Sequence, residues 1–273
     1  MSLALGACSA IKLGYNNLNS VAYWWLDSYI DFTDPQTTQV RDDLGRLHLW
    51  HRTQELPRFV EMLRSMEELA PRNVSATQAC DFIPLVRERI RAVAERAEPQ
   101  VTALAMRLGP EQLAHLEHKY DKINAAYRKE WVMLDKAARR DKRTEQFIDR
   151  SEMVYGTLQD SRREALRKQM EISVFDPARN LAERQRRQGD LLQTLRKLSG
   201  TTASEATTLL RGYIDRFENS PDPAYRAYQK ALQDESCRDF SALHNSTSAA
   251  QREAAARRLR AYQRDLRELA AHQ

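Results

Sequence analysis

Glycine, proline and cysteine are all scarce in this sequence, with 8, 9 and 3 occurrences among 273 residues. Few helix-breaking residues, a hydrophobic share of 42% and a charged share of 30% favour long amphipathic helices over a sandwich, a barrel or a nucleotide-binding α/β fold. Three cysteines exclude a disulfide-dense scaffold. No apolar run approaches the ~18 residues that a membrane-spanning helix needs. The sequence therefore predicts an all-α fold without a membrane-spanning helix.

Motifs that bind nucleotides or build hydrolytic sites are absent as well. The sequence contains no Gly-x-Ser-x-Gly, no Gly-x-Gly-x-x-Gly, no phosphate-binding loop with Lys and Ser or Thr, and no His-Glu-x-x-His. With so few glycines, little of the backbone can approach a phosphate closely. We therefore expect a protein that is not an enzyme and has no cofactor.

Hydrophobic periodicity and helix-start signals predict about eight or nine helices in a multi-helix bundle with no sheet. Pro57 is expected to kink the second segment, and Pro84 and Pro99 to break the third. The expected helical segments are residues 12–32, 35–70, 76–108, 110–140, 142–172, 177–200, 203–218, 223–243 and 249–271.

Two of these segments carry apolar stripes that are typical of buried bundle seams. The stripes consist of Leu113, Leu116, Tyr120, Ile123, Tyr127, Trp131 and Leu134, and of Ala255, Leu259, Tyr262, Leu266 and Leu269. A separate aromatic group near the N-terminus fits either packing on the bundle or a position at a bilayer interface, and we expect packing. This group is Tyr23, Trp24, Trp25 and Tyr29.

The N-terminal residues Leu5-Gly6-Ala7-Cys8 look like a bacterial lipobox, in which the cysteine is acylated and becomes the first residue. Only Leu3 to Ala7 stand where a longer apolar stretch is usual, and no Lys or Arg precedes them. Either the start codon lies further upstream or the signal has been trimmed. We expect residues 1–8 to be the remnant of a signal peptide, Cys8 to carry lipid, and residues 9–273 to form a single domain. An incidental cysteine in a cytosolic protein is the alternative.

Several further motifs make the chain resemble a family of uncharacterised proteobacterial envelope lipoproteins known only as a domain of unknown function. They are Ser9-Ala10-Ile11-Lys12-Leu13-Gly14-Tyr15-Asn16-Asn17-Leu18, Ala22-Tyr23-Trp24-Trp25-Leu26-Asp27-Ser28-Tyr29-Ile30-Asp31-Phe32, Leu47-His48-Leu49-Trp50-His51-Arg52, Leu108-Gly109-Pro110-Glu111-Gln112-Leu113, Phe175-Asp176-Pro177, Glu183-Arg184-Gln185-Arg186-Arg187-Gln188 and Leu243-His244-Asn245-Ser246-Thr247. The resemblance implies export and lipid anchoring in the cell envelope, facing the periplasm, with the outer membrane favoured over the inner. It implies no known catalysis.

Cys80 and Cys237 are the two cysteines that remain if Cys8 is acylated. Disulfides persist in oxidising compartments, so export would allow these two thiols to form a single bridge. We expect that bridge. Two buried free thiols, which pack as small hydrophobic groups, are the alternative.

Two histidine pairs, His48-x-x-His51 and His115-x-x-His118, have the spacing at which two side chains share a helix face and could hold a metal ion. The second pair lies off the apolar stripe of its helix, so the two pairs face different environments. We therefore expect one pair at the edge of the core, one pair in solvent, and no metal site.

Basic residues exceed acidic ones by 43 to 38, giving a net charge of +5. The excess is small and spread among acidic residues, with three short basic clusters, which we expect to be solvated helix faces because acidic residues are interleaved. Binding to nucleic acid or to anionic lipid headgroups would also fit such clusters. The clusters are residues 139–143, 184–187 and 257–260.

The most consistent function is that of a membrane-anchored periplasmic helical lipoprotein with a non-enzymatic binding or structural role. Its partners would be the membrane, through the N-terminal lipid, and an unknown envelope protein or polymer. A periplasmic chaperone-like or metal-binding stress sensor is the first alternative, and a cytosolic basic protein that binds nucleic acid is the second.

Overall fold

The computed structural model describes residues 11–271, which are almost entirely helical and contain no strand. The expected all-α fold is confirmed. The helices are α2 (Leu18–Ile30), α3 (Asp34–Trp50), the π-helix η1 (His51–Glu55), α4 (Leu56–Leu69), α5 (Ala76–Cys80), α6 (Phe82–Ala105), α7 (Pro110–Tyr127), the π-helix η2 (Arg128–Val132), α8 (Lys136–Tyr155), α9 (Asp160–Glu171), α10 (Pro177–Lys197), α11 (Ala203–Glu218), α12 (Pro223–Ser246) and α13 (Ala249–Ala271). Residues 11–16 are helical too.

The helices exceed the expected eight or nine because several predicted segments are divided. Residues 142–172 form no single helix: α8 ends at Gly156, whose φ of 74° a residue with a side chain rarely adopts. The segment 76–108 is divided at Asp81, and the two breaks expected at Pro84 and Pro99 are wrong. Pro84 lies in the first turn of α6, where a missing N–H costs nothing, and Pro99 is accommodated inside that helix.

The kink expected at Pro57 takes the form of a π turn. In η1 the Leu56 N–H bonds to the carbonyl of His51, five residues earlier, and Pro57 follows directly. A proline ring clashes with the carbonyl four residues before it, and the wider turn relieves that clash while the chain stays helical.

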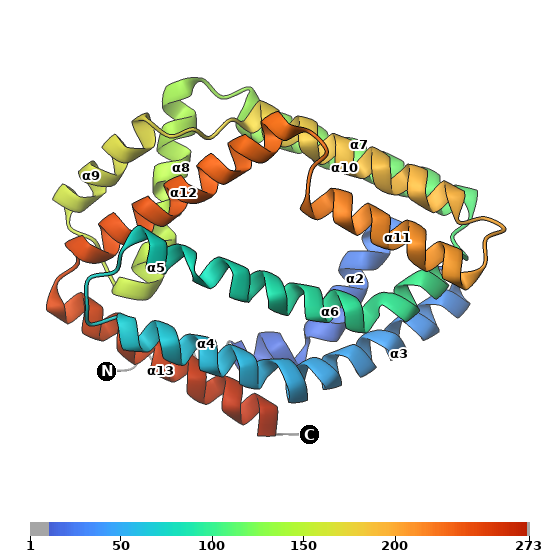
Figure 1. Cartoon of the computed structure of the whole chain (residues 1–273), viewed down its shortest axis with the longest axis horizontal. Coiled ribbons are helices and arrows are strands. Elements are labelled where there is room, and N and C mark those ends of the chain that lie inside the picture. The colour runs from blue at the N-terminus through green and yellow to red at the C-terminus, as the bar shows by residue number, and fades with distance from the viewer. Residues whose placement is uncertain (1–10, 272–273) are drawn as a thin grey trace.

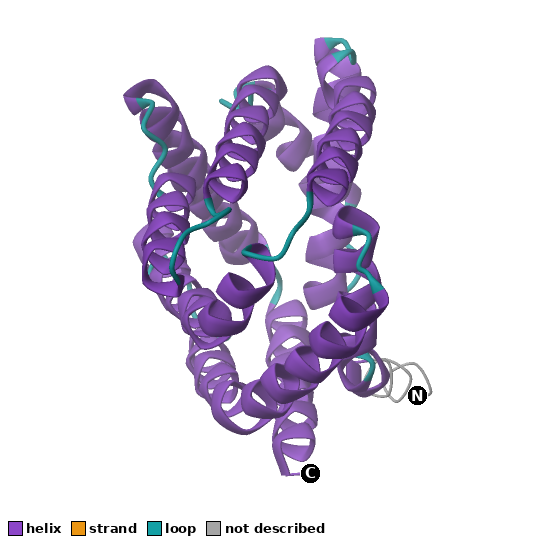
Figure 2. Cartoon of the chain, turned by 90° about the vertical axis from the view of Figure 1, so that its right-hand side faces the viewer, coloured by secondary structure: helices purple, strands orange, loops and turns teal. Residues whose placement is uncertain are grey.

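The described helices enclose two separate cores at opposite ends of an open frame (Figure 1). One core joins α7, α10 and α11 with the end of α6, around Leu116, Leu198 and Ala206. The other joins α8, α9, α12 and α13, around Ile148 and Leu158. Figure 2 shows from the side that the connections between the helices are short loops. Among residues 11–271, no helix is long and apolar enough to cross a membrane.

Helix α6 links the two halves of the frame. It begins beside Cys80, and its buried residues, Thr102 and Ala105, lie only in its last turn. Its longer first part reaches the opposite helices through polar side chains, with Arg87 on Gln233 of α12 and Arg211 of α11 on Glu98. Full burial therefore occurs only at one end of α6, while the other end is partly buried and lies next to a covalent bond.

The N-terminal aromatic residues do not all pack as expected. Tyr23 is buried, with its hydroxyl 2.9 Å from Thr37 Oγ1, and Tyr29 packs on the first core. Trp24 and Trp25 are instead 63% and 59% exposed. Trp25 contacts the Tyr29 ring, at 4.8 Å between ring centres, and the packing prediction is wrong for Trp24, because the helix turns its other side towards α3 and α7.

Candidate ligand cavity and disulfide

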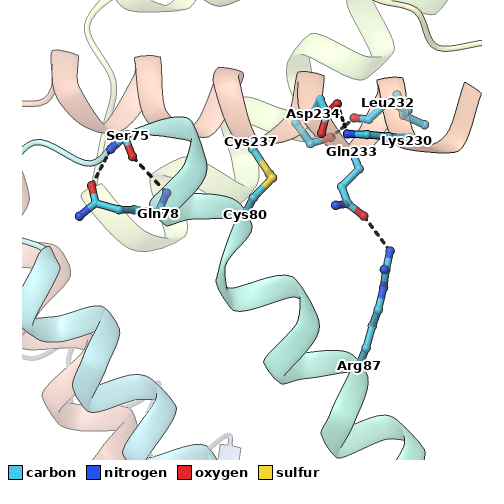
Figure 3. Close-up of a disulfide and its surroundings, with 10 residues drawn as sticks. Ser75, Gln78, Cys80, Arg87, Lys230, Leu232, Gln233, Asp234 and Cys237 are labelled. Atoms are coloured by element: carbon cyan, nitrogen blue, oxygen red, sulfur yellow. Dashed lines mark hydrogen bonds and ion pairs between the residues drawn. A yellow bond between two sulfur atoms is a disulfide. The ribbon is translucent and has the colours of Figure 1, made fainter. Parts of the chain in front are cut away.

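Cys80 and Cys237 form the disulfide expected from the sequence. Their sulfur atoms are 2.07 Å apart, and the bond joins the end of α5 to the middle of α12 across 157 residues of chain (Figure 3). Ser75 caps the short helix α5 by accepting a hydrogen bond from the Gln78 N–H. No residue of α5 is fully buried. The disulfide therefore holds a helix that apolar packing alone holds weakly.

An apolar cavity of about 390 Å³ lies against this disulfide. Its wall is built by α4, α5, α6, α8, α12 and α13, together with the loop between α4 and α5. The lining side chains are Met66, Leu69, Ala70, Val74, Ala79, Phe82, Ile83, Val154, Tyr155, Ser236, Cys237, Phe240, His244, Ala255 and Leu259. Ser236 and Phe240 are exposed, which places the opening of the cavity beside α12.

The polar side chains in the wall are hydrogen-bonded within the protein, and the exposed Ser236 hydroxyl donates to the carbonyl of Leu232 at 2.9 Å. His244 Nε2 lies 2.7 Å from the carbonyl of Arg72, and its Nδ1 lies 2.8 Å from the Tyr155 hydroxyl. A carbonyl can only accept, so Nε2–H donates to Arg72 and Nδ1 accepts from Tyr155. Burial lowers the pKa of His244 and raises the pKa of Tyr155 to about 12. Both side chains are therefore neutral near pH 7, and neither has a donor left for a ligand.

The loop that closes one side of the cavity is fastened to α12. The Val74 N–H donates to Asn245 Oδ1 at 2.8 Å, and the Val74 carbonyl accepts from Ser241 Oγ at 2.6 Å and from Asn245 Nδ2 at 3.0 Å. These hydrogen bonds occupy both backbone polar groups of Val74, the lining residue that this loop contributes. The wall of the cavity is consequently preformed and presents hydrocarbon.

Size and chemistry together define what such a cavity can hold. A volume of about 390 Å³ lies within the usual range of ligand pockets, about 300–1,000 Å³, and is more than twice that of an apolar cavity that holds benzene. By proportion, on the order of 12–16 carbon atoms would fill it. The lining offers no Asp, Glu, Lys or Arg side chain and is mostly hydrocarbon, so its chemistry suits binding of an apolar group.

Sequence reasoning found only part of this site. It identified the cysteine pair and the stripe residues Ala255 and Leu259, and the motif at 243–247 contains His244. It missed the cavity itself, because the lining residues come from six helices whose relative placement is a tertiary property. The signal available in the sequence was His244, which stands close to the polar residues Ser241 and Asn245.

The two histidine pairs contact different parts of the N-terminal helical segment. His51 Nδ1 is 2.8 Å from the Tyr15 hydroxyl, and the His48 ring lies beside the Tyr15 ring. His115 and His118 are exposed, and His115 Nε2 is 3.3 Å from the carbonyl of Ser28. Within residues 11–271, no group of three or more His, Cys, Asp or Glu side chains is placed to hold a metal ion.

The three basic clusters are engaged within the chain. Arg186 and Arg187 both bond to the buried Glu183, and Arg186 also bonds to Asp190. The cluster at 139–143 forms ion pairs with residues 130, 141, 171 and 235, and the cluster at 257–260 with residues 67 and 253. Cys8, the expected lipid attachment site, lies outside the described residues.

A family model matches residues 28–221, from the last turn of α2 to just beyond α11, which is more than two thirds of the chain. Its description is a family of unknown function, DUF6279. The chain belongs to this family. The DUF6279 match includes Cys80 and stops short of Cys237, so α12 and α13, which complete the cavity, lie outside it. No curated protein and no solved structure matches the chain.

Proposed function

We propose that this protein is an exported helical lipoprotein, anchored to a membrane of a proteobacterial cell envelope and facing the periplasm, with the outer membrane favoured over the inner. Its role is to bind an apolar ligand without catalysing a reaction. The disulfide between Cys80 and Cys237 supports export, because such bonds persist in oxidising compartments and are rare in the cytosol. The lipobox-like sequence that ends at Cys8 supports the anchor.

The observation that carries the binding role is the preformed apolar cavity beside the disulfide. The buried polar side chains in its wall, Tyr155 and His244, are neutral and bonded to each other. A charged or strongly hydrogen-bonding ligand would lose its hydration there without gaining partners, which is costly. A hydrocarbon chain loses nothing, so a lipid acyl chain or a similar aliphatic group of a partner is the ligand class that fits.

The alternatives from the sequence receive less support from the contacts. A metal-binding sensor would need histidine pairs that converge, whereas one pair lies on Tyr15 and the other beside Ser28. A nucleic-acid-binding protein needs cationic groups available to phosphates, whereas Arg186 and Arg187 of the cluster at 184–187 already pair with Glu183, and Arg186 also with Asp190.

A fluorescence titration tests the binding role. N-phenyl-1-naphthylamine is uncharged, apolar and brighter in apolar surroundings, and 1-dodecanol serves as a competitor. Ala79→Phe places a ring inside the cavity, and Ser236→Trp covers its exposed opening. We expect each change to weaken probe binding at least about tenfold, a loss of about 1.4 kcal/mol.

Ala231→Phe is the matched control for Ala79→Phe, because Ala231 is exposed on α12 and does not line the cavity. It should leave the affinity unchanged. Circular dichroism checks that each variant is folded. Equal affinities for the wild type and for a folded Ser236→Trp variant, or a failure of 1-dodecanol to displace the probe, would refute the binding role.

A further inference from the structure

The exposed face of the N-terminal helix is unusual for this chain because it carries no charge. Residues 11–16 are helical, Asn17 forms a turn, and α2 follows; the bonds from Asn17 N to Leu13 O and from Val21 N to Asn17 O span this turn and keep the two pieces in register. Eight exposed residues of the segment fall within one arc of about 140° at 100° per residue. We call this set the N-terminal face; it consists of Leu13, Gly14, Asn17, Leu18, Val21, Trp24, Trp25 and Ser28.

Large apolar side chains dominate this face. Leu13 is 68% exposed, Val21 52%, Trp24 63% and Trp25 59%. By contrast, 30% of the residues in the whole chain are charged. Single exposed apolar residues are ordinary, but a continuous apolar helix face marks an interaction surface.

The opposite side of the helix is fixed to the body of the protein. Tyr29 and Ile30 pack on the first core, and the Tyr23 hydroxyl lies 2.9 Å from Thr37 Oγ1 of α3. The helix therefore cannot turn its tryptophans inward without losing these contacts. The N-terminal face is presented to the outside by a rigid support.

We propose that the N-terminal face lies in the interfacial region of a lipid bilayer. A helix with aromatic and aliphatic residues on one side is the structure that buries its apolar face at the boundary between headgroups and acyl chains. Tryptophan suits this depth because its ring is apolar and its N–H can bond to headgroups. This proposal rests on the proposed function only for the compartment. In the sequence, the face begins a few residues after Cys8, the proposed site of lipid attachment.

Cationic side chains of α3 and α7 contact two aromatic rings of α2 that lie outside the N-terminal face. The Arg41 guanidinium of α3 lies 3.7 Å from the centre of the Tyr23 ring. The Lys119 ammonium of α7 lies 5.1 Å from the centre of the Tyr29 ring. Arg41 is exposed and Lys119 partly exposed, so both place positive charge at the surface next to this helix, where it would attract anionic headgroups.

A second copy of the chain fits this face less well than a bilayer. A stable protein interface uses about 20–30 residues from each partner. The N-terminal face offers eight residues along one helix. A bilayer needs no such area, because each apolar side chain that enters it gains independently.

Vesicle flotation of the full chain with Cys8→Ser tests the proposal, since this variant cannot be acylated. The vesicles are mixtures of phosphatidylethanolamine and phosphatidylglycerol. We expect the protein to float with the vesicles, its tryptophan emission to shift to shorter wavelength, and lipids brominated on their acyl chains to quench that emission. Trp24→Ser with Trp25→Ser, or Val21→Asp alone, should lower the partition coefficient at least about tenfold. Val21→Asp keeps both tryptophans for the fluorescence measurement.

Ile172→Ser with Val174→Ser is the matched control. Both residues are exposed and apolar, at 85% and 44%, and lie between α9 and α10, away from the face. This control should float like its parent. The proposal would be overturned if the Cys8→Ser chain does not float, or if the face and control variants partition equally. It would also be overturned if the chain dimerises with increasing concentration and Val21→Asp abolishes that dimerisation. Finding no acyl group on native Cys8 would refute the lipid anchor and leave this result unchanged.

Discussion

Loss of the disulfide should destabilise the whole chain and loosen one region in particular. The perturbation is Cys80→Ala combined with Cys237→Ala, or reduction of the wild-type protein. The bond closes a loop of 157 residues. The chain-entropy model gives about 5 kcal/mol as the upper value for a loop of this length, and measured losses are commonly about 2–5 kcal/mol. We therefore expect the free energy of unfolding to fall by about 2–5 kcal/mol.

The structure also indicates where the loss should be felt first. No residue of α5 is fully buried, and α6 has its buried residues only at its far end. Without the covalent bond, α5 and the first turns of α6 should open locally before the rest of the chain unfolds. Amide hydrogen exchange in residues 76–95 should accelerate more than exchange in α10, which belongs to the first core, around Leu116 and Leu198.

Urea unfolding followed by circular dichroism gives the global value, and mass-spectrometric hydrogen exchange gives the local one. Reductant is the internal control, since it should destabilise the wild type and leave the double variant unchanged. A loss below about 1 kcal/mol, or exchange that accelerates equally throughout, would refute the argument that this bond secures a weakly packed helix.

Three further changes test the polar interior. Burial alone would raise the pKa of Glu183, but hydrogen bonds from two neighbouring arginines hold that pKa below the usual 4.5. The contribution of ionised Glu183 to the stability of the fold is therefore complete above about pH 5 and is lost as the pH falls through the folded-state pKa. Glu183→Gln should cost about 1–3 kcal/mol at pH 7 and flatten the acid limb of a stability–pH curve. Burial and a neighbouring carboxylate raise the pKa of Asp239 to about 6, so stability falls as the pH rises from about 4 to about 6. Asp239→Asn should therefore stabilise the protein above pH 6 by about 1 kcal/mol, and an unchanged urea midpoint there would contradict this. Tyr155→Phe leaves Nδ1 of the buried His244 without its partner and should cost about 1–3 kcal/mol in the same assay.

Local features of the fold were predictable because they depend on neighbouring residues. The helix starts near Pro35, Pro110 and Pro177 follow from proline in a first turn, and the stripe from Ala255 to Leu269 is buried or partly buried, as expected. Gly156 was missed as a helix end because its left-handed backbone is a property of the folded chain.

The site required information that periodicity lacks. The cysteine pair could be predicted from the number of cysteines and the expected compartment, and the structure bonds that pair. The cavity depends on the angles between six helices, which no stripe specifies. Likewise, the uncharged arc around Trp24 and Trp25 can be read from the sequence, but an apolar arc does not reveal whether it faces the core or the outside.

Mass spectrometry of the native protein, extracted from cell membranes and digested without reductant, tests export and anchorage most directly. The account predicts an N-terminal peptide that begins at an acylated Cys8, together with a disulfide-linked peptide that contains Cys80 and Cys237. An N-terminal peptide with an unmodified Cys8 thiol, accompanied by reduced Cys80, would contradict it.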